Sequence, residues 1–286
     1  MDIDAEHGKL VVMAFARTLG TLERSDCKIH YEVTGTGPRA IVFAHGLGGN
    51  HLSWFQQVAH FAPHFTCVTF AHRGFAPSSP IPGGPDPKDY AGDLAALIAH
   101  LNLTDVRIVA QSMGGWTTIE YALNRPPELK AIVLACTTGT IDPQQIDEPE
   151  RARLAPWIQT EFAKVPALFA RGIHPAAGER MSREQPAQHL LYRHIDDQNA
   201  SLDKQTLGAK LMAARTRSPK DLNKIACPIL FVVGEEDVLI PNFAADAFAR
   251  VASNAKVAHI HEAGHSAYFE RPKAFNAVVQ KFFDEI

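Results

Sequence analysis

The sequence has few cysteines, and none of them has the spacing of a structural scaffold. Cys27, Cys67, Cys136 and Cys227 lie far apart and include no C-x-x-C pair, which indicates buried thiols rather than a disulfide framework or a zinc site. A chain of 286 residues can also bury a full core without such links. The expected setting is a reducing cytoplasm.

An excess of basic charge and a long hydrophobic run are also lacking. The chain has 28 basic and 31 acidic side chains, so its net charge of −3 provides no field that would concentrate nucleic acid. No segment approaches the roughly 18 to 20 consecutive apolar residues of a membrane-spanning helix. The acidic start at residues 1–6 differs from the basic start of a secretory signal. We therefore expect neither nucleic acid nor a membrane as a partner.

Repeats and Pro/Gly/Ser-rich linkers are missing too, which favours one continuous fold over tandem domains. What the chain does contain is a series of short apolar runs between amphipathic stretches. The runs, interpreted as buried parallel strands, are residues 40–44, 65–70, 106–110, 131–135, 229–233 and 256–260. Residues 90–101 and 272–283 have helical apolar spacing. This alternation predicts an α/β fold with a mostly parallel, doubly wound sheet.

Two segments depart from this pattern. Residues 18–23 and 28–33 are predicted to form an antiparallel pair before the parallel strands begin. Residues 138–223 have no strand pattern and are predicted to form a helical cap inserted in a core of residues 1–137 and 224–286. The cap contains Trp157, Phe162, Phe169 and Tyr192, which could line an apolar pocket, although such residues more often serve packing in a helical insertion.

A candidate nucleophile follows the predicted strand 106–110. The segment Gln111-Ser112-Met113-Gly114-Gly115 leads directly into a helical stripe, so Ser112 lies on a strand-to-helix turn. Such a turn needs small neighbours, which Ala110 and Gly114 provide. A serine that only caps an ordinary helix is the alternative interpretation.

With Ala110 in place of the first glycine, this turn resembles the G-x-S-x-G nucleophile elbow of the α/β-hydrolase family. Two later loops also resemble that family. Asp237 ends Gly234-Glu235-Glu236-Asp237, where Glu235 and Glu236 are its rivals as the acid, and His265 lies in Ala263-Gly264-His265-Ser266. The chain order Ser112, Asp237, His265 is that of the family's triad, in which histidine is the base and the acid orients it.

Two backbone amides are expected to stabilise an oxyanion. The family takes one N–H from the residue after the nucleophile, here Met113. The segment His45-Gly46-Leu47-Gly48-Gly49 is similar to the family's H-G-x-G loop, which offers the Leu47 N–H as the second donor. His45 itself is predicted to be structural. Residues 71–78 match the family's D-x-R-G-x-G-x-S segment only in part.

The other histidines are weaker candidates. His259 and His261 form an H-x-H pair, but no cysteine or carboxylate accompanies them at a ligand spacing, and His60 and His64 are no better. We therefore predict neither a metal nor a cofactor.

The resemblance implies a cofactor-free serine hydrolase that cleaves a small carboxylic ester or lactone. A carbon–carbon hydrolase is the alternative, because the elbow is similar to the Asn-Ser-Met-Gly-Gly elbow of meta-cleavage-product hydrolases. Against this, Gln111 replaces the asparagine, and Ser266 stands where many of those enzymes have tryptophan. Dehalogenases and epoxide hydrolases carry aspartate at the position of Ser112. A ligand-binding receptor on the same fold is a third possibility. The sequence identifies neither the substrate nor the oligomeric state.

Overall fold

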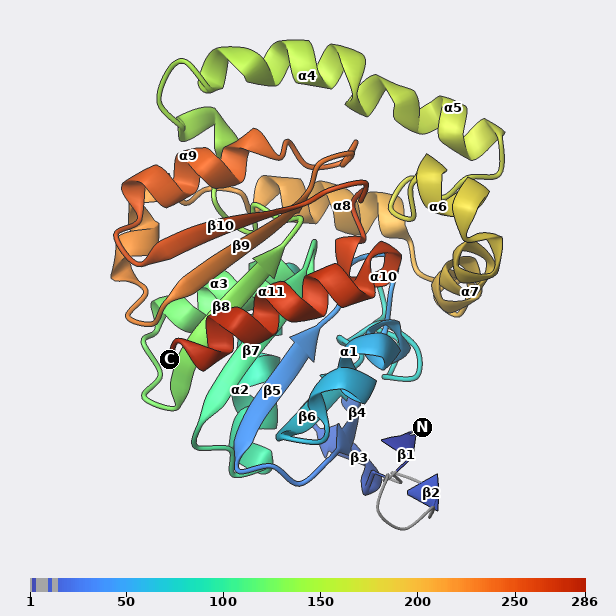
Figure 1. The fold of residues 1–286 in the computed structure, drawn as a ribbon, viewed down its shortest axis with the longest axis vertical. Coiled ribbons are helices and arrows are strands. Elements are labelled where there is room, and N and C mark those ends of the chain that lie inside the picture. The colour runs from blue at the N-terminus through green and yellow to red at the C-terminus, as the bar shows by residue number, and fades with distance from the viewer. Residues whose placement is uncertain (1, 4–9, 12–14) are drawn as a thin grey trace.

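The computed structural model describes residues 2–3, 10–11 and 15–286, so most of the acidic start lies outside the described residues. Its centre is an eight-stranded sheet of order β10-β9-β8-β7-β5-β6-β4-β3 (Figure 1). The strands are β3 (Arg17–Glu23), β4 (Lys28–Thr34), β5 (Arg39–Ala44), β6 (Phe65–Phe70), β7 (Val106–Gln111), β8 (Leu129–Ala135), β9 (Ile229–Gly234) and β10 (Ala255–Ile260). A separate antiparallel pair joins β1 (Asp2–Ile3) to β2 (Leu10–Val11).

The helices connect these strands. The α-helices are α1 (Phe55–Phe61), α2 (Tyr90–His100), α3 (Gly114–Leu123), α4 (Leu154–Thr160), α5 (Val165–Ala170), α6 (Glu179–Glu184), α7 (Pro186–Asp197), α8 (Lys204–Ala213), α9 (Phe243–Val251), α10 (Ala267–Glu270) and α11 (Pro272–Asp284). The 3₁₀ helices are η1 (His51–Trp54), η2 (Pro87–Asp89), η3 (Pro143–Gln145), η4 (Arg151–Arg153), η5 (Phe162–Lys164) and η6 (Pro219–Lys224).

The sheet is parallel from β10 to β6 and antiparallel at β4 and β3, which confirms the predicted fold class and the predicted early pair. The central strands β5, β7 and β9 are buried on both faces, and successive residues along each point to opposite sides. Ile108 packs in the core that contains residues of α2, α3 and α9. Its neighbour Val109 packs in the other core, which contains residues of α1 and α11. All four predicted cysteine thiols are free and buried.

Residues 136–228, all of which the structure describes, form turns and helices but no strand. Figure 1 shows α4 and α5 above the sheet, on the side toward which the arrow of β5 points. A parallel bridge between Ile141 and Arg217 joins the beginning and the end of this segment. The boundaries at 138 and 223, and the role of the segment as a cap, stay predictions. In the described part of the chain no helix is long and apolar enough to cross a membrane.

The parallel strands bring the predicted site residues to one edge of the sheet. The loop containing Leu47 follows β5, Ser112 follows β7, Asp237 follows β9 and His265 follows β10. The carboxyl ends of parallel strands are where ligands bind in open α/β sheets. The candidate site therefore lies at this edge.

Candidate active site

The backbone of Ser112 is in the left-handed region, with φ of 49°. An L-residue other than glycine rarely adopts this conformation, so the surrounding structure must hold it there. The Ser112 N–H donates to the Ala135 carbonyl at 3.0 Å. The Ser112 carbonyl accepts from the Gly115 N–H at 2.8 Å and from the Thr137 hydroxyl at 2.7 Å.

The turn at Ser112 also needs a glycine two residues later. A Cβ at Gly114 would lie 2.2 Å from the Ala44 carbonyl oxygen, which belongs to the neighbouring strand β5. Helix α3 can therefore start against β5 only without a side chain at this position. The result is a half-buried serine at the N-terminus of a helix, as the motif predicted.

Asp237 and His265 are joined by a buried hydrogen bond. Asp237 Oδ2 lies 2.9 Å from His265 Nδ1, and the two residues are only 4% and 3% exposed. The other carboxylate oxygen of Asp237 accepts from the amides of Leu239 and Ile240, at 2.8 and 3.0 Å. The carboxylate is therefore held in one orientation, with Oδ2 directed to the imidazole.

The two rival acids have other partners. Glu235 contacts the exposed His261, and Glu236 accepts from Arg180. Of these three carboxylates, only Asp237 contacts His265 among the described residues.

One cavity of about 590 Å³ has both Ser112 and His265 in its wall. No hydrogen bond joins these two side chains among the residues that the structure describes. Leu47 and Met113 line the same cavity. Four of the five predicted site residues thus line one cavity, and the fifth, Asp237, is bonded to one of them, His265. Their catalytic roles stay predictions.

Aromatic residues from the segment between β8 and β9 close the other side of this cavity. Trp157, Phe162, Phe169 and Tyr192 all line it. Of the two uses that the sequence left open, lining a pocket applies to all four, while Tyr192 and Trp157 also pack against the hydrophobic cores. The helical pattern could not show this, because a side chain that faces a cavity and one that faces a core have the same spacing along a helix.

The loop after β5 runs beside Ser112. A Cβ at Gly46 would lie 2.1 Å from Gln111 Oε1 and 3.1 Å from the Ser112 Cβ, so this glycine permits the close approach. Within the described residues, the amides of Leu47 and Met113 donate no hydrogen bond to the protein. Two unused donors next to the serine are what an oxyanion hole requires.

His45 lies beneath this loop and is fully buried. Its Nε2 accepts from the His72 N–H at 3.0 Å, so its Nδ1 carries the proton and donates to the Gly46 carbonyl at 2.8 Å. Burial lowers the pKa of His45 to about 3. A neutral imidazole therefore links the start of this loop to His72, in agreement with the structural role predicted for it.

Glu270 holds the histidine loop and was missed by sequence reasoning. Its Oε2 accepts from the Gly264 N–H at 2.8 Å and its Oε1 from the Ser266 N–H at 3.1 Å, so the carboxyl group binds the amides on both sides of His265. Burial raises the pKa of Glu270 to about 8, against the opposing effect of these two donors. An acidic residue one turn into a helix, four residues after Ser266, was the only available signal.

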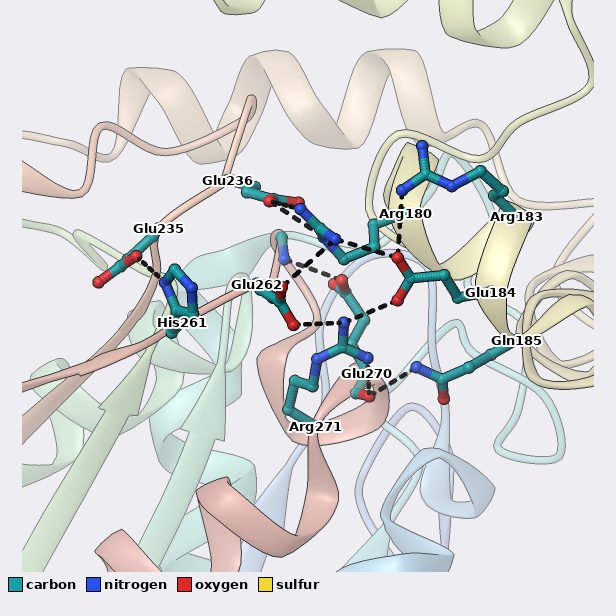
Figure 2. A network of polar contacts seen from close by, with 11 residues as sticks. Arg180, Arg183, Glu184, Gln185, Glu235, Glu236, His261, Glu262, Glu270 and Arg271 are labelled. Carbon is teal, nitrogen blue, oxygen red and sulfur yellow. Dashed lines mark hydrogen bonds and ion pairs between the residues drawn. The ribbon is translucent and has the colours of Figure 1, made fainter.

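A network of ion pairs connects α6 with the two loops that carry Asp237 and His265 (Figure 2). Arg180 donates to both carboxylate oxygens of Glu236 at 3.0 Å and lies 3.6 Å from Glu262. Arg271 completes the network through Glu184, at 3.1 Å, and Glu262, at 3.6 Å. These ion pairs connect α6, and with it the helical segment between β8 and β9, to both loops.

A possible metal-ligand cluster lies away from this site. Ligand atoms of His30, Glu32 and His51 all lie within 4.8 Å of one another. Arg17, however, donates to both oxygens of Glu32 at 3.0 and 2.8 Å, which already balances the carboxylate charge. The three residues span two elements, so no local spacing in the sequence could indicate them.

Known proteins match this chain along most of its length. The family model described as alpha/beta hydrolase fold matches residues 39–272. The 3-oxoadipate enol-lactonase 2 of Acinetobacter baylyi is 27% identical over 267 residues, covering 91% of this chain and 94% of the relative. A thermophilic esterase from Thermogutta terrifontis superposes with a TM-score of 0.72 and 24% identity, covering 94% of this chain and 98% of its own. A bromoperoxidase from Bacillus anthracis gives 0.73 and 23%, covering 94% and 100%.

The family match spans well over half of the chain, so the protein belongs to the alpha/beta hydrolase fold family. The two solved structures, which are less than 25% identical, show the same fold. Membership of this family and the hydrolytic relatives support hydrolase activity.

The strain at Ser112 gives a first prediction. S112G removes the side chain from a left-handed backbone, so we expect the free energy of unfolding to rise by about 1 kcal/mol, measured by urea denaturation. The matched exchange S182G, inside α6, should lower it by about 0.5 kcal/mol. A loss of stability in S112G would show that the turn is not strained.

A second prediction concerns Glu270. In E270Q one acceptor oxygen of the carboxylate becomes an NH₂ group that faces a backbone N–H, so we expect a loss of about 1–3 kcal/mol in the free energy of unfolding at pH 9, where Glu270 is ionised. E262Q, which alters an exposed carboxylate paired only at 3.6 Å, should change it by less than about 0.5 kcal/mol.

The raised pKa of Glu270 also predicts how the free energy of unfolding depends on pH. The folded state retains this proton up to about pH 8, while the unfolded state releases it near 4.5. Stability from this group is therefore complete below pH 4.5 and is lost as the pH rises through 8. Measured by urea denaturation from pH 5 to 8.5, the free energy of unfolding should decline less in E270Q than in the wild type. Parallel declines would contradict the assignment.

Proposed function

We propose that the protein is a serine hydrolase that cleaves a carboxylic ester or lactone through an acyl-enzyme intermediate. The observation that carries this proposal is the buried hydrogen bond from Asp237 to His265, whose imidazole lines the same cavity as Ser112. An imidazole fixed by a carboxylate beside a serine is the arrangement that activates a hydroxyl nucleophile.

In the proposed reaction the Ser112 oxygen attacks the substrate carbonyl carbon while His265 Nε2 takes the hydroxyl proton. Asp237 keeps the proton of the imidazole on Nδ1 and stabilises the imidazolium. The amides of Leu47 and Met113 donate to the oxyanion. When the intermediate collapses, His265 gives its proton to the leaving alcohol. Water then attacks the acyl group with His265 again as the base, which releases the acid and restores Ser112.

The segment of residues 138–223 acts as a cap in this proposal. Its aromatic side chains make one side of the cavity apolar, and this suits the hydrocarbon part of a small ester or lactone. An apolar wall also keeps water away from the acyl-enzyme until hydrolysis. Differences in this wall would then determine which substrates are accepted.

The relatives support this choice. The Acinetobacter relative is named as an enol-lactonase and the Thermogutta structure as an esterase.

A substrate panel separates the alternative functions. Turnover of a ring-fission dienoate but not of esters would favour carbon–carbon hydrolysis instead. Absence of both reactions, together with failure of a fluorophosphonate probe to label the protein, would favour a receptor.

The test compares single-residue variants on a short 4-nitrophenyl ester. S112A should abolish fluorophosphonate labelling and lower kcat by at least about 10³-fold, because it removes the nucleophile. D237N should lower kcat by about 10³- to 10⁴-fold, because the imidazole loses its orienting partner.

E235Q is the matched control for D237N, because Glu235 is two residues away and contacts the exposed His261 instead. It should retain kcat within about twofold. If S112A keeps most of the wild-type turnover, or if D237N and E235Q are equally active, the assigned mechanism is wrong.

A further inference from the structure

One cation in the wall of the cavity has no acidic partner in the described part of the chain. Lys204 lines the cavity and pairs with Asp196 at 2.5 Å, and His174 lies 3.5 Å from the same carboxylate. Arg215 also lines the cavity. Among the residues that the structure describes, its side chain makes no ion pair and no hydrogen bond.

The Arg215 guanidinium is sheltered from water. Its Nε is buried without a hydrogen-bond partner. Burial lowers the pKa of Arg215 to about 10, with Asp142 opposing the shift from beyond ion-pair distance, so the group is still charged at neutral pH. A buried charge without a counter-charge destabilises the folded state unless a group of opposite charge pairs with it.

The orientation of Arg215 is set by Trp116, in helix α3 one turn after Ser112. The guanidinium carbon lies 5.0 Å from the centre of the Trp116 ring. The ring is itself held, because its Nε1–H donates to the Leu211 carbonyl at 2.8 Å. Stacking satisfies the flat face of a guanidinium and leaves the N–H groups at its edge available to a carboxylate.

We infer that Arg215 binds a carboxylate of the substrate, and that the enzyme acts on esters or lactones which carry a free carboxylate in addition to the scissile group. This inference rests on the proposed function and specifies its substrate class. A planar guanidinium pairs with a carboxylate through two parallel hydrogen bonds, and the otherwise apolar wall strengthens this pairing.

Arg217 provides a matched control. It lies two residues further along the chain, and its guanidinium already pairs with Glu120 at 3.0 and 2.7 Å. It is not among the residues that line the cavity. Loss of Arg217 removes the same charge from the chain without touching the proposed subsite.

The kinetic test uses 4-nitrophenyl monoesters of dicarboxylic acids with five to eight carbons, each paired with the neutral acyl ester of equal carbon number. 4-Acetoxybenzoate and phenyl acetate form a further pair with the carboxylate in the alcohol part. The readout is the ratio of kcat/KM for the anionic member to that for the neutral member.

R215M should lower this ratio by 10- to 100-fold for the best-matched pair, mainly through KM, since the contact is made in both the bound substrate and the transition state. R215K should retain part of the ratio, and R217M should keep it within twofold. Equal effects of R215M on both members of every pair would overturn the inference.

A binding test separates this inference from the proposed function. S112A is titrated by calorimetry with the free dicarboxylates of five to eight carbons from which these monoesters derive, so no hydrolysis is needed. The tightest of them should bind at least 10-fold more weakly to S112A/R215M than to S112A, with S112A/R217M unchanged, and salt should weaken the binding. Equal affinities, or no binding to S112A, would overturn the inference. Ester turnover by S112A would refute the proposed mechanism. The measured affinities would still show whether Arg215 binds a carboxylate.

Discussion

The parallel pairing of β7 between β5 and β8 is the constraint on which the site depends. It fixes the end of β7 beside the end of β5, so the turn at Ser112 must pass the Ala44 carbonyl at a distance that only glycine at position 114 permits. The same pairing continues through β9 and β10 and brings Asp237 and His265 to the same edge. Residues more than 100 positions apart thus meet because hydrogen-bonded strands cannot slip without exposing a buried face.

Three buried polar side chains at the site are held in place by hydrogen-bond partners. Asp237 has two amides and one imidazole, Glu270 has the two amides beside His265, and His45 has a donor and an acceptor. Each buried group is oriented by these bonds, and a buried group with fixed partners cannot reorient cheaply. In the cavity wall, by contrast, the buried Nε of Arg215 has no hydrogen-bond partner among the described residues, and this contrast is why its unmade interactions point to a ligand.

The helical segment between β8 and β9 has two relations to the core. On one side its aromatic residues face the cavity, and on the other α6 is tied by Arg180 to the loops that carry the acid and the histidine. Exposed ion pairs of this kind contribute little stability individually. Their arrangement nevertheless connects the position of the segment to the two loops that carry Asp237 and His265.

The sequence by itself determined the layered fold, because buried strands and amphipathic helices have periodicities that neighbouring residues reveal. It also located Ser112, through the small residues that its tight turn needs, whereas Asp237 and His265 were placed by the resemblance of their loops to those of the α/β-hydrolase family. Only the tertiary structure decided that Asp237 rather than Glu235 or Glu236 contacts His265, that Glu270 binds the histidine loop, and that Arg215 has no acidic partner within the described part of the chain. These facts depend on distances between distant segments, and no local pattern of residues records which side chains will meet or which will be left without a partner.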